Sequence, residues 1–208
     1  MVNTEARSAD PTREAAPADN ISDPGPLGLA GFAATTLVLS FVNAGLVDKS
    51  VAFAVLPLAL FYGGLGQFIA GMWEFRKGNT FGSTAFSTYG AFWLAFAFYE
   101  WFFAAKVATS SAGTAEGLFL LVFAVVTVYL TVAALRTTGA ILAVFVLLSL
   151  TFIFLTIGAL AGADAIGHIG GWIGILTAIA AFYTSFAGVA NATFKRAVLP
   201  VWPLNIGA

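Results

Sequence analysis

Cysteine is absent from this chain of 208 residues, histidine occurs once, and charged residues make up only 9% of it. Without cysteine the protein can form no disulfide, no thiolate metal site and no thiol nucleophile. A single histidine without clustered carboxylates also falls short of the usual ligand set for a metal ion. No segment is basic enough to form a face for nucleic acid. We therefore expect no enzymatic activity, no cofactor, no metal site and no nucleic-acid partner.

Long apolar segments dominate what is present. Hydrophobic residues make up 60% of the chain, and the mean hydropathy is +0.93. Six segments carry no Asp, Glu, Lys or Arg, and each has about the 20 residues that a helix needs to cross a bilayer. These segments are 24–47, 50–73, 78–99, 117–135, 137–163 and 165–194. The sequence predicts an all-α integral membrane protein with six transmembrane helices.

The polar residues divide the chain into three parts. Residues 1–23 are polar and have no apolar core, so we expect a disordered cytoplasmic tail rather than a signal peptide. Residues 24–194 form the predicted six-helix transmembrane domain. Residues 195–208 follow as a C-terminal tail, which we also expect in the cytoplasm.

The basic residues predict the orientation in the membrane. Six spans place both termini on one side, and that side would carry seven of the nine Lys and Arg residues; Lys49 and Lys106 would lie on the other. The seven are Arg7, Arg13, Arg76, Lys77, Arg136, Lys195 and Arg196. Basic residues accumulate on the cytoplasmic side of membrane proteins. We therefore expect a multi-pass protein of the cytoplasmic membrane with both termini inside the cell.

Polar groups inside or beside the apolar segments are the candidates for chemistry. The polar segments 23–28 and 79–84 begin predicted helices, whose free N–H groups can bind an anion or can simply be capped. Glu74 and His168 are candidates for proton transfer or pH sensing. The alternatives are a helix-end carboxylate paired with nearby basic residues, and a histidine in a loop before a final helix over about 169–190.

Three segments resemble one known family. Residues 23–29 (DPGPLGL) resemble the N-P-[AG]-P-L-G-L signature of the acetate uptake transporter family (YaaH type). The segment 61–94, from FYGG through KGNTFG to YGAFWL, looks like the central block of the same family. His168 with GWIG at 171–174, and VLP at 198–200, looks like its last helix and tail.

The resemblance implies a six-helix protomer around a central path, assembled as a hexamer, that passes acetate and related small monocarboxylates, with succinate in some members. It also implies an apolar constriction formed by Phe32, Tyr89 and Leu150. We expect the substrate to contact residues of the first three helices: Leu27, Gly28, Thr35, Gln67, Asn79, Thr84, Thr88 and Tyr89. The chain departs from the family signature at Asp23, where an asparagine is usual.

The composition agrees with a path for small organic acids. An apolar constriction rejects strongly hydrated ions, because they would have to shed their water. Hydroxyl groups and helix ends would then hold the carboxylate, and Tyr89 could donate a hydrogen bond to it. Two alternatives stay open: a channel for water or neutral solutes, and a membrane scaffold or sensor that transports nothing.

Overall fold

The computed structural model describes residues 21–204, and within them the protein is a bundle of long helices without a β-strand. The long helices are α1 (Gly25–Asn43), α3 (Gln67–Lys77), α4 (Thr80–Phe98), α5 (Ala112–Ala134), α6 (Gly139–Ala161) and α7 (Asp164–Phe194). Short helices complete the second and third spans: η1 (Lys49–Ala54), α2 (Val55–Leu60), η2 (Phe61–Gly66), η3 (Tyr99–Phe103), η4 (Ala104–Lys106) and η5 (Thr109–Ser111).

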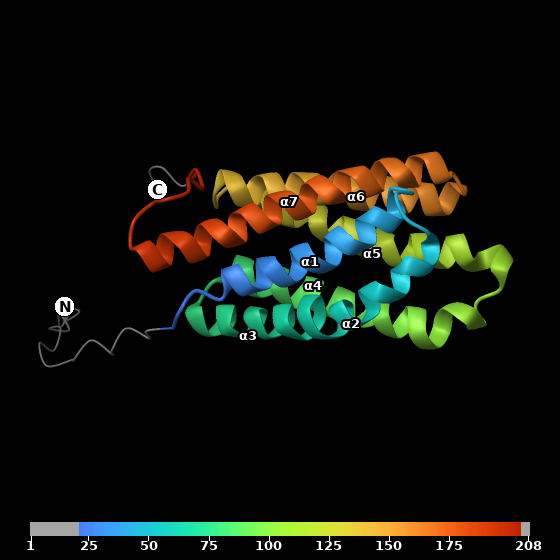
Figure 1. Cartoon of the computed structure of the whole chain (residues 1–208), viewed down its shortest axis with the longest axis horizontal. Helices are drawn as coiled ribbons and strands as arrows, with labels where there is room; N and C mark the ends of the chain where they lie inside the picture. The colour runs from blue at the N-terminus through green and yellow to red at the C-terminus, as the bar shows by residue number, and fades with distance from the viewer. Residues whose placement is uncertain (1–20, 205–208) are drawn as a thin grey trace, which may run out of the picture.

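Helices α1 and α7 lie side by side through the middle of the bundle (Figure 1). Helices α5 and α6 pack on one side of this pair, and α2, α3 and α4 lie on the other (Figure 1). Helix α7 packs closely against both α1 and α6. Small residues permit the approach, because a side chain at Gly171 would collide with the backbone of Ala44 in the turn after α1.

The bundle has the dimensions and composition of a membrane domain. Five described segments are long and apolar enough to cross a bilayer: Gly25–Asn43, Lys49–Lys77, Thr109–Ala134, Gly139–Ala161 and Asp164–Phe194. Helix α4 corresponds to the remaining predicted span and is not among these five; three threonines and two serines lie in its first half. The predicted all-α membrane fold is confirmed, and its spans follow the predicted order.

The two ends of the bundle differ in charge. The first turn of α1 and the last turn of α7 lie at the same end (Figure 1). Helices α3, α5 and α7 also finish there, so Arg76, Lys77 and Arg136 gather at what we call the basic end. The other end carries Asp48, Glu100, Glu116 and Asp164 beside Lys49 and Lys106, and we call it the acidic end.

The second span is interrupted by a π-helical segment, η2. It lies against α1, and two glycines make the contact possible. A side chain at Gly31 of α1 would stand 2.5 Å from the carbonyl oxygen of Tyr62, and one at Gly63 would stand 2.5 Å from the side chain of Thr35. The glycine-rich stretch is therefore a site of close helix contact.

One predicted boundary is wrong. Asp164 and His168 were expected in a loop before a helix beginning near Ile169, but α7 already begins at Asp164. Gly162 adopts a left-handed conformation with φ of 61° and ends α6, so the turn needs only Gly162 and Ala163. A tight turn of this kind requires no further loop residues.

The segment after α7 folds back on the bundle. The side-chain oxygen of Asn191 accepts hydrogen bonds from the backbone N–H groups of Val198 and Leu199. The hydroxyl of Tyr183 donates to the carbonyl oxygen of Pro200, and its ring stacks on Trp202. The predicted disordered tail over 1–23 lies almost entirely outside the described residues.

Candidate functional site: a cavity and an apolar neck

A cavity of about 390 Å³ enters the bundle from the acidic end. Its mouth is lined by Lys49, Glu100, Glu116, Asp164 and His168. Farther in, the walls are mostly aromatic and aliphatic side chains of α1, α4, α5 and α6. Its volume falls within the range of pockets that hold small molecules.

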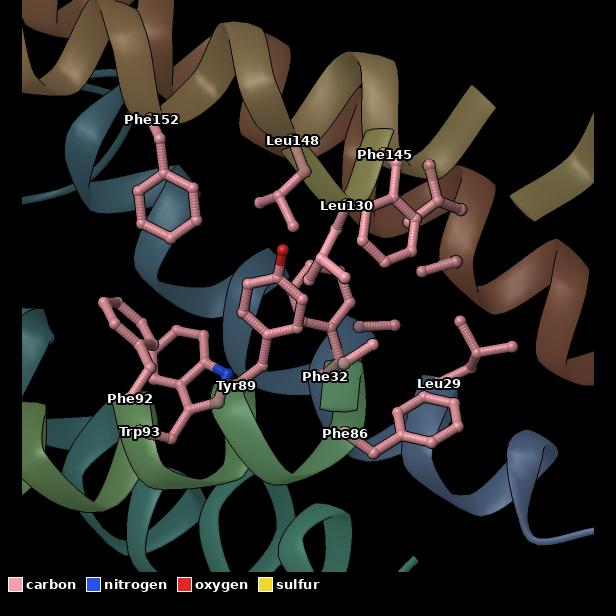
Figure 2. Packing of buried hydrophobic residues seen from close by; sticks show 14 of the residues in the cluster. Leu29, Phe32, Phe86, Tyr89, Phe92, Trp93, Leu130, Phe145, Leu148 and Phe152 are labelled. Atoms are coloured by element: carbon pink, nitrogen blue, oxygen red, sulfur yellow. The ribbon is translucent and has the colours of Figure 1, made fainter. Parts of the chain in front are cut away.

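The innermost part of the cavity is formed by Phe32 of α1, Tyr89 of α4 and Leu148 of α6, which we call the neck. All three are buried, with 5%, 3% and 3% of their surfaces exposed. The rings of Phe32 and Tyr89 are in contact, with centroids 5.8 Å apart. Figure 2 shows the Tyr89 hydroxyl pointing toward Leu148. The predicted grouping of Phe32 with Tyr89 is therefore present in the structure.

Aromatic side chains continue from the neck toward the basic end. Phe145 lies against Tyr89 with ring centroids 6.1 Å apart, and Phe81 lies against Phe145 at 5.1 Å. Phe86 and Leu29 pack on the same side of the neck (Figure 2). The cavity reaches the neck from the acidic end, and this packed cluster fills the way beyond it.

The Tyr89 hydroxyl is held by a neighbouring helix. It lies 2.9 Å from Oγ1 of Thr127 on α5, and the Thr127 hydroxyl donates to the carbonyl oxygen of Phe123 at 2.6 Å. Because Thr127 has a single hydroxyl proton, which is already donated, Tyr89 must be the donor to Thr127. A passing carboxylate could receive that hydrogen bond only after the contact with Thr127 breaks.

Leu150, the expected third neck residue, does not lie at the cavity within the protomer. Leu150 is 40% exposed on the outer face of α6 and does not line the cavity among the residues that the structure describes. Two residues along a helix correspond to about 200° of rotation, so Leu148 and Leu150 point in nearly opposite directions. Leu148, on the opposite face of the same helix, is the buried leucine that lines the cavity.

Most of the other predicted contacts lie away from the cavity. Leu27 is 46% exposed near the basic end, and a side chain on Gly28 would overlap the ring of Phe86. The Thr35 hydroxyl donates to its own helix, at the carbonyl oxygens of Gly31 and Phe32. In this conformation none of the three predicted residues reaches the cavity, as far as the described residues extend.

Predicted contacts on the second and third spans are also outside the cavity. Gln67 is fully buried, and no partner for its Oε1 is present among the described residues. Thr84 and Thr88 are half-buried on α4. Of the predicted substrate contacts, Tyr89 lines the cavity.

The basic end holds a separate polar cluster. Asn79 caps α4 by accepting from the N–H of Gly82, and its amide donates to Glu74 Oε2 at 2.8 Å. Asp23 accepts from the Lys77 ammonium at 2.7 Å, which ties the start of α1 to the end of α3. The carboxylate that replaces the asparagine of the family signature thus has a cationic partner. Glu74, a candidate for proton transfer, lies in this cluster and not at the cavity.

His168 is the predicted pH-sensing candidate that the structure does place at the cavity. Its imidazole lies over Gly45, where an added side chain would stand 3.0 Å from Nε2. Within residues 21–204 no group of three or more His, Asp or Glu side chains could hold a metal ion.

The expected constriction and substrate contacts did not include four residues that lie at the cavity or neck: Leu148, Thr36, Trp93 and Thr127. A signal for Leu148 was available, because Phe145, Leu148 and Phe152 recur at spacings of three and four residues along one face of α6. Helix α6 is apolar on every face, however, so its sequence does not show which face turns inward.

Membrane-spanning helices around a cavity that ends in an apolar neck are typical of polytopic membrane transport proteins. The sequence profile of the GPR1/FUN34/yaaH family matches residues 6–206, and the chain belongs to this family. The predicted relationship to the acetate uptake transporters of the YaaH type is confirmed.

Three similar proteins illustrate the family. The succinate-acetate/proton symporter SatP of Escherichia coli K12 is 37% identical over 183 residues, covering 87% of this chain and 95% of that one. The ammonia transport outward protein 2 of Saccharomyces cerevisiae is 41% identical over 181 residues, covering 85% of this chain and 64% of that one. A solved structure of the bacterial acetate channel SatP is 36% identical, with a TM-score of 0.81, and the match covers 87% of this chain and 99% of that chain.

Proposed function

We propose that this protein passes acetate and related small monocarboxylates across the cytoplasmic membrane, through the cavity and the neck. The observation that carries the proposal is the neck of Phe32, Tyr89 and Leu148 at the inner end of a mostly apolar cavity. The similarity to SatP, whose name states succinate and acetate, points to the same substrates.

The chemistry of the path suits a short acid with a methyl group. A fully hydrated inorganic ion must lose water to pass a neck of three buried apolar side chains, which opposes its entry. Acetate has only one charged group, and its methyl group is compatible with Phe32 and Leu148. Three carboxylates, those of Glu100, Glu116 and Asp164, share the mouth with Lys49, so the charge at the mouth does not concentrate anions and selection depends on the neck.

The orientation and assembly are part of the proposal. The basic end faces the cytoplasm by the bias of basic residues, so the cavity opens to the outside. The protomers assemble as a homo-oligomer, a hexamer by resemblance to the family. Apolar side chains such as Val125, Val132 and Phe186, each more than 60% exposed in the protomer, contact lipid or neighbouring protomers.

The test is uptake by the purified protein in liposomes. We expect entry of labelled acetate at rates well above those of protein-free vesicles, and little entry of glycerol. Water or glycerol permeability without acetate uptake would favour the neutral-solute channel, and ammonium permeability without acetate uptake would favour ammonia transport. An assembled protein that passes none of these would favour the scaffold. Uptake with and without a pH gradient at fixed voltage separates a channel from a proton-coupled carrier.

A further inference from the structure

Aromatic side chains are packed together between the neck and the basic end. The ring of Phe145 lies between two others, with its centroid 6.1 Å from that of Tyr89 and 5.1 Å from that of Phe81. Figure 2 shows Phe145 and Phe86 on one side of Tyr89, and Phe152, which lines the cavity, on the other. Phe81, Phe86 and Phe145 do not line the cavity that the described residues form. They therefore lie beyond the neck, on the side away from the open mouth.

This packing extends the barrier along the helices. Helices α4 and α6 begin at the basic end, because they follow α3 and α5, which finish there. Phe145 precedes Leu148 of the neck by about 4.5 Å along α6, and Phe81 precedes Tyr89 by about 12 Å along α4. A solute that has passed the neck therefore still has to pass the Phe145 and Phe81 rings before it reaches the basic end.

Phe81 is the side chain of this packing that can move at the lowest cost. It lies in the first turn of α4, directly after the tight turn in which Gly78 has a φ of 76°, and it is only partly buried. The ends of helices open more readily than their interiors. Phe86 is held more firmly, because a side chain at Gly28 of α1 would stand 2.6 Å from its ring. Movement of Phe81 would uncover Phe145 while the rest of the bundle stays packed.

We propose that Phe81 and Phe145 form a second gate, on the basic side of the neck. The proposal rests on the proposed function and divides the work between two barriers. The neck, with Leu148, selects acids by size, and the contact between Phe81 and Phe145 limits how often any acid that has passed the neck leaves toward the basic end. Both side chains are apolar, so the closed gate holds no substrate and acts by keeping water out of the path.

The first test measures transport by variants that lose the ring contact. Phe81→Leu keeps an apolar side chain, and Phe81→Ala removes most of it. Each should raise the rate of acetate uptake into liposomes at saturating acetate roughly twofold to tenfold, the factor that corresponds to the loss of one contact between aromatic rings. The ratio of lactate to acetate uptake should stay at the wild-type value, because Leu148 is unchanged. The matched control is Phe75→Leu, which is 59% exposed on α3 at the same end and should leave the rate unchanged.

The second test reads the gate without transport and uses the absence of cysteine from the chain. Leu130 of α5 is 4% exposed and follows Thr127, the partner of Tyr89, so it lies between the neck and Phe81. Leu130→Cys therefore places one thiol between the two barriers. A membrane-impermeant sulfonated maleimide should modify it slowly from either end of the protein.

Each barrier should protect this thiol from one end. Adding Phe81→Ala to Leu130→Cys should speed modification from the basic end roughly tenfold, because a buried thiol reacts only when the reagent reaches it, and should not speed it from the acidic end. Adding Leu148→Ala should do the reverse. Exposed thiols from Asp48→Cys at the acidic end and Arg196→Cys at the basic end show which end each vesicle preparation presents.

Two results would overturn the second gate. One is fast modification of the thiol at position 130 from the basic end while Phe81 is still present. The other is a Phe81→Leu protein, shown to be folded by oligomer size and thermal unfolding, with a wild-type acetate rate, together with unchanged modification in Phe81→Ala. A wild-type protein that passes no acetate would instead overturn the proposed function, and the thiol modification would still decide whether Phe81 closes the basic side.

Discussion

Leu148 should limit the size of the acids that pass the neck. It is 3% exposed and contributes one wall of the neck, and Leu148→Ala removes the branched end of that wall. Lactate and propionate are each larger than acetate, and forcing one additional methylene into a packed site costs about 1–3 kcal/mol. Removal of the leucine side chain should relieve most of that cost.

The magnitude follows from the rate law. Each 1.4 kcal/mol of barrier is a factor of about ten in rate, so the ratio of lactate to acetate uptake should rise roughly fivefold to a hundredfold in Leu148→Ala. The assay is the initial rate of uptake of each labelled acid into liposomes that contain the purified variant. Folding is monitored separately, since a buried leucine-to-alanine change destabilises proteins by about 2–5 kcal/mol.

Leu150→Ala is the matched control on the same helix. Leu150 is 40% exposed on the other face of α6, so its substitution should leave the ratio within about twofold of the wild type. A widened substrate range in Leu150→Ala together with an unchanged range in Leu148→Ala would refute the assignment of the neck.

Two further predictions concern the packing around the neck. Thr127→Val should lower the free energy of unfolding by about 1–3 kcal/mol, because the buried Tyr89 hydroxyl loses its acceptor. In the double variant with Tyr89→Phe, the loss of stability should be smaller than the sum of the two single losses. Full additivity would count against the hydrogen bond between Tyr89 and Thr127. Gly63→Ala should destabilise the protein by about 1–3 kcal/mol, because the new methyl group would stand 2.5 Å from the side chain of Thr35. The control is Gly167→Ala, which should leave stability unchanged because the new methyl group would have nothing within 4 Å. Thermal unfolding in detergent measures both, and equal effects of the two alanines would contradict the close contact between α1 and η2.

The sequence alone predicted the membrane class and the order of the spans, and the family resemblance grouped Phe32 with Tyr89, whose rings are in contact in the structure. Charge-poor segments of about 20 residues define spans because the bilayer has a fixed thickness. Phe32 and Tyr89 were placed by motifs on α1 and α4. Which face of α6 turns inward was not predicted, because the helix is apolar on every face and positions 148 and 150 are both leucine.

The hydrogen-bond donors of Thr36 and Trp93, which line the cavity, were not predicted for a related reason. Thr35 and Thr36 are adjacent threonines, and the sequence does not show which one bonds back to its own helix; the structure shows that Thr35 does. Trp93 belongs to the segment 61–94 that carries the family resemblance, and the sequence does not show whether its indole N–H has a partner. Its missing hydrogen-bond partner becomes visible only when the neighbouring helices are in place.

The central claim is that acetate crosses the protein through the neck, and Phe32→Trp tests it most directly. The larger indole should fill the space between Tyr89 and Leu148, and acetate uptake into liposomes should fall to the level of protein-free vesicles. Oligomer size should stay that of the wild type, and cooperative thermal unfolding should show that the variant is folded, although the larger ring in a packed site should lower its stability by about 1–3 kcal/mol. Uptake at the wild-type rate by a folded, assembled Phe32→Trp protein would contradict the account.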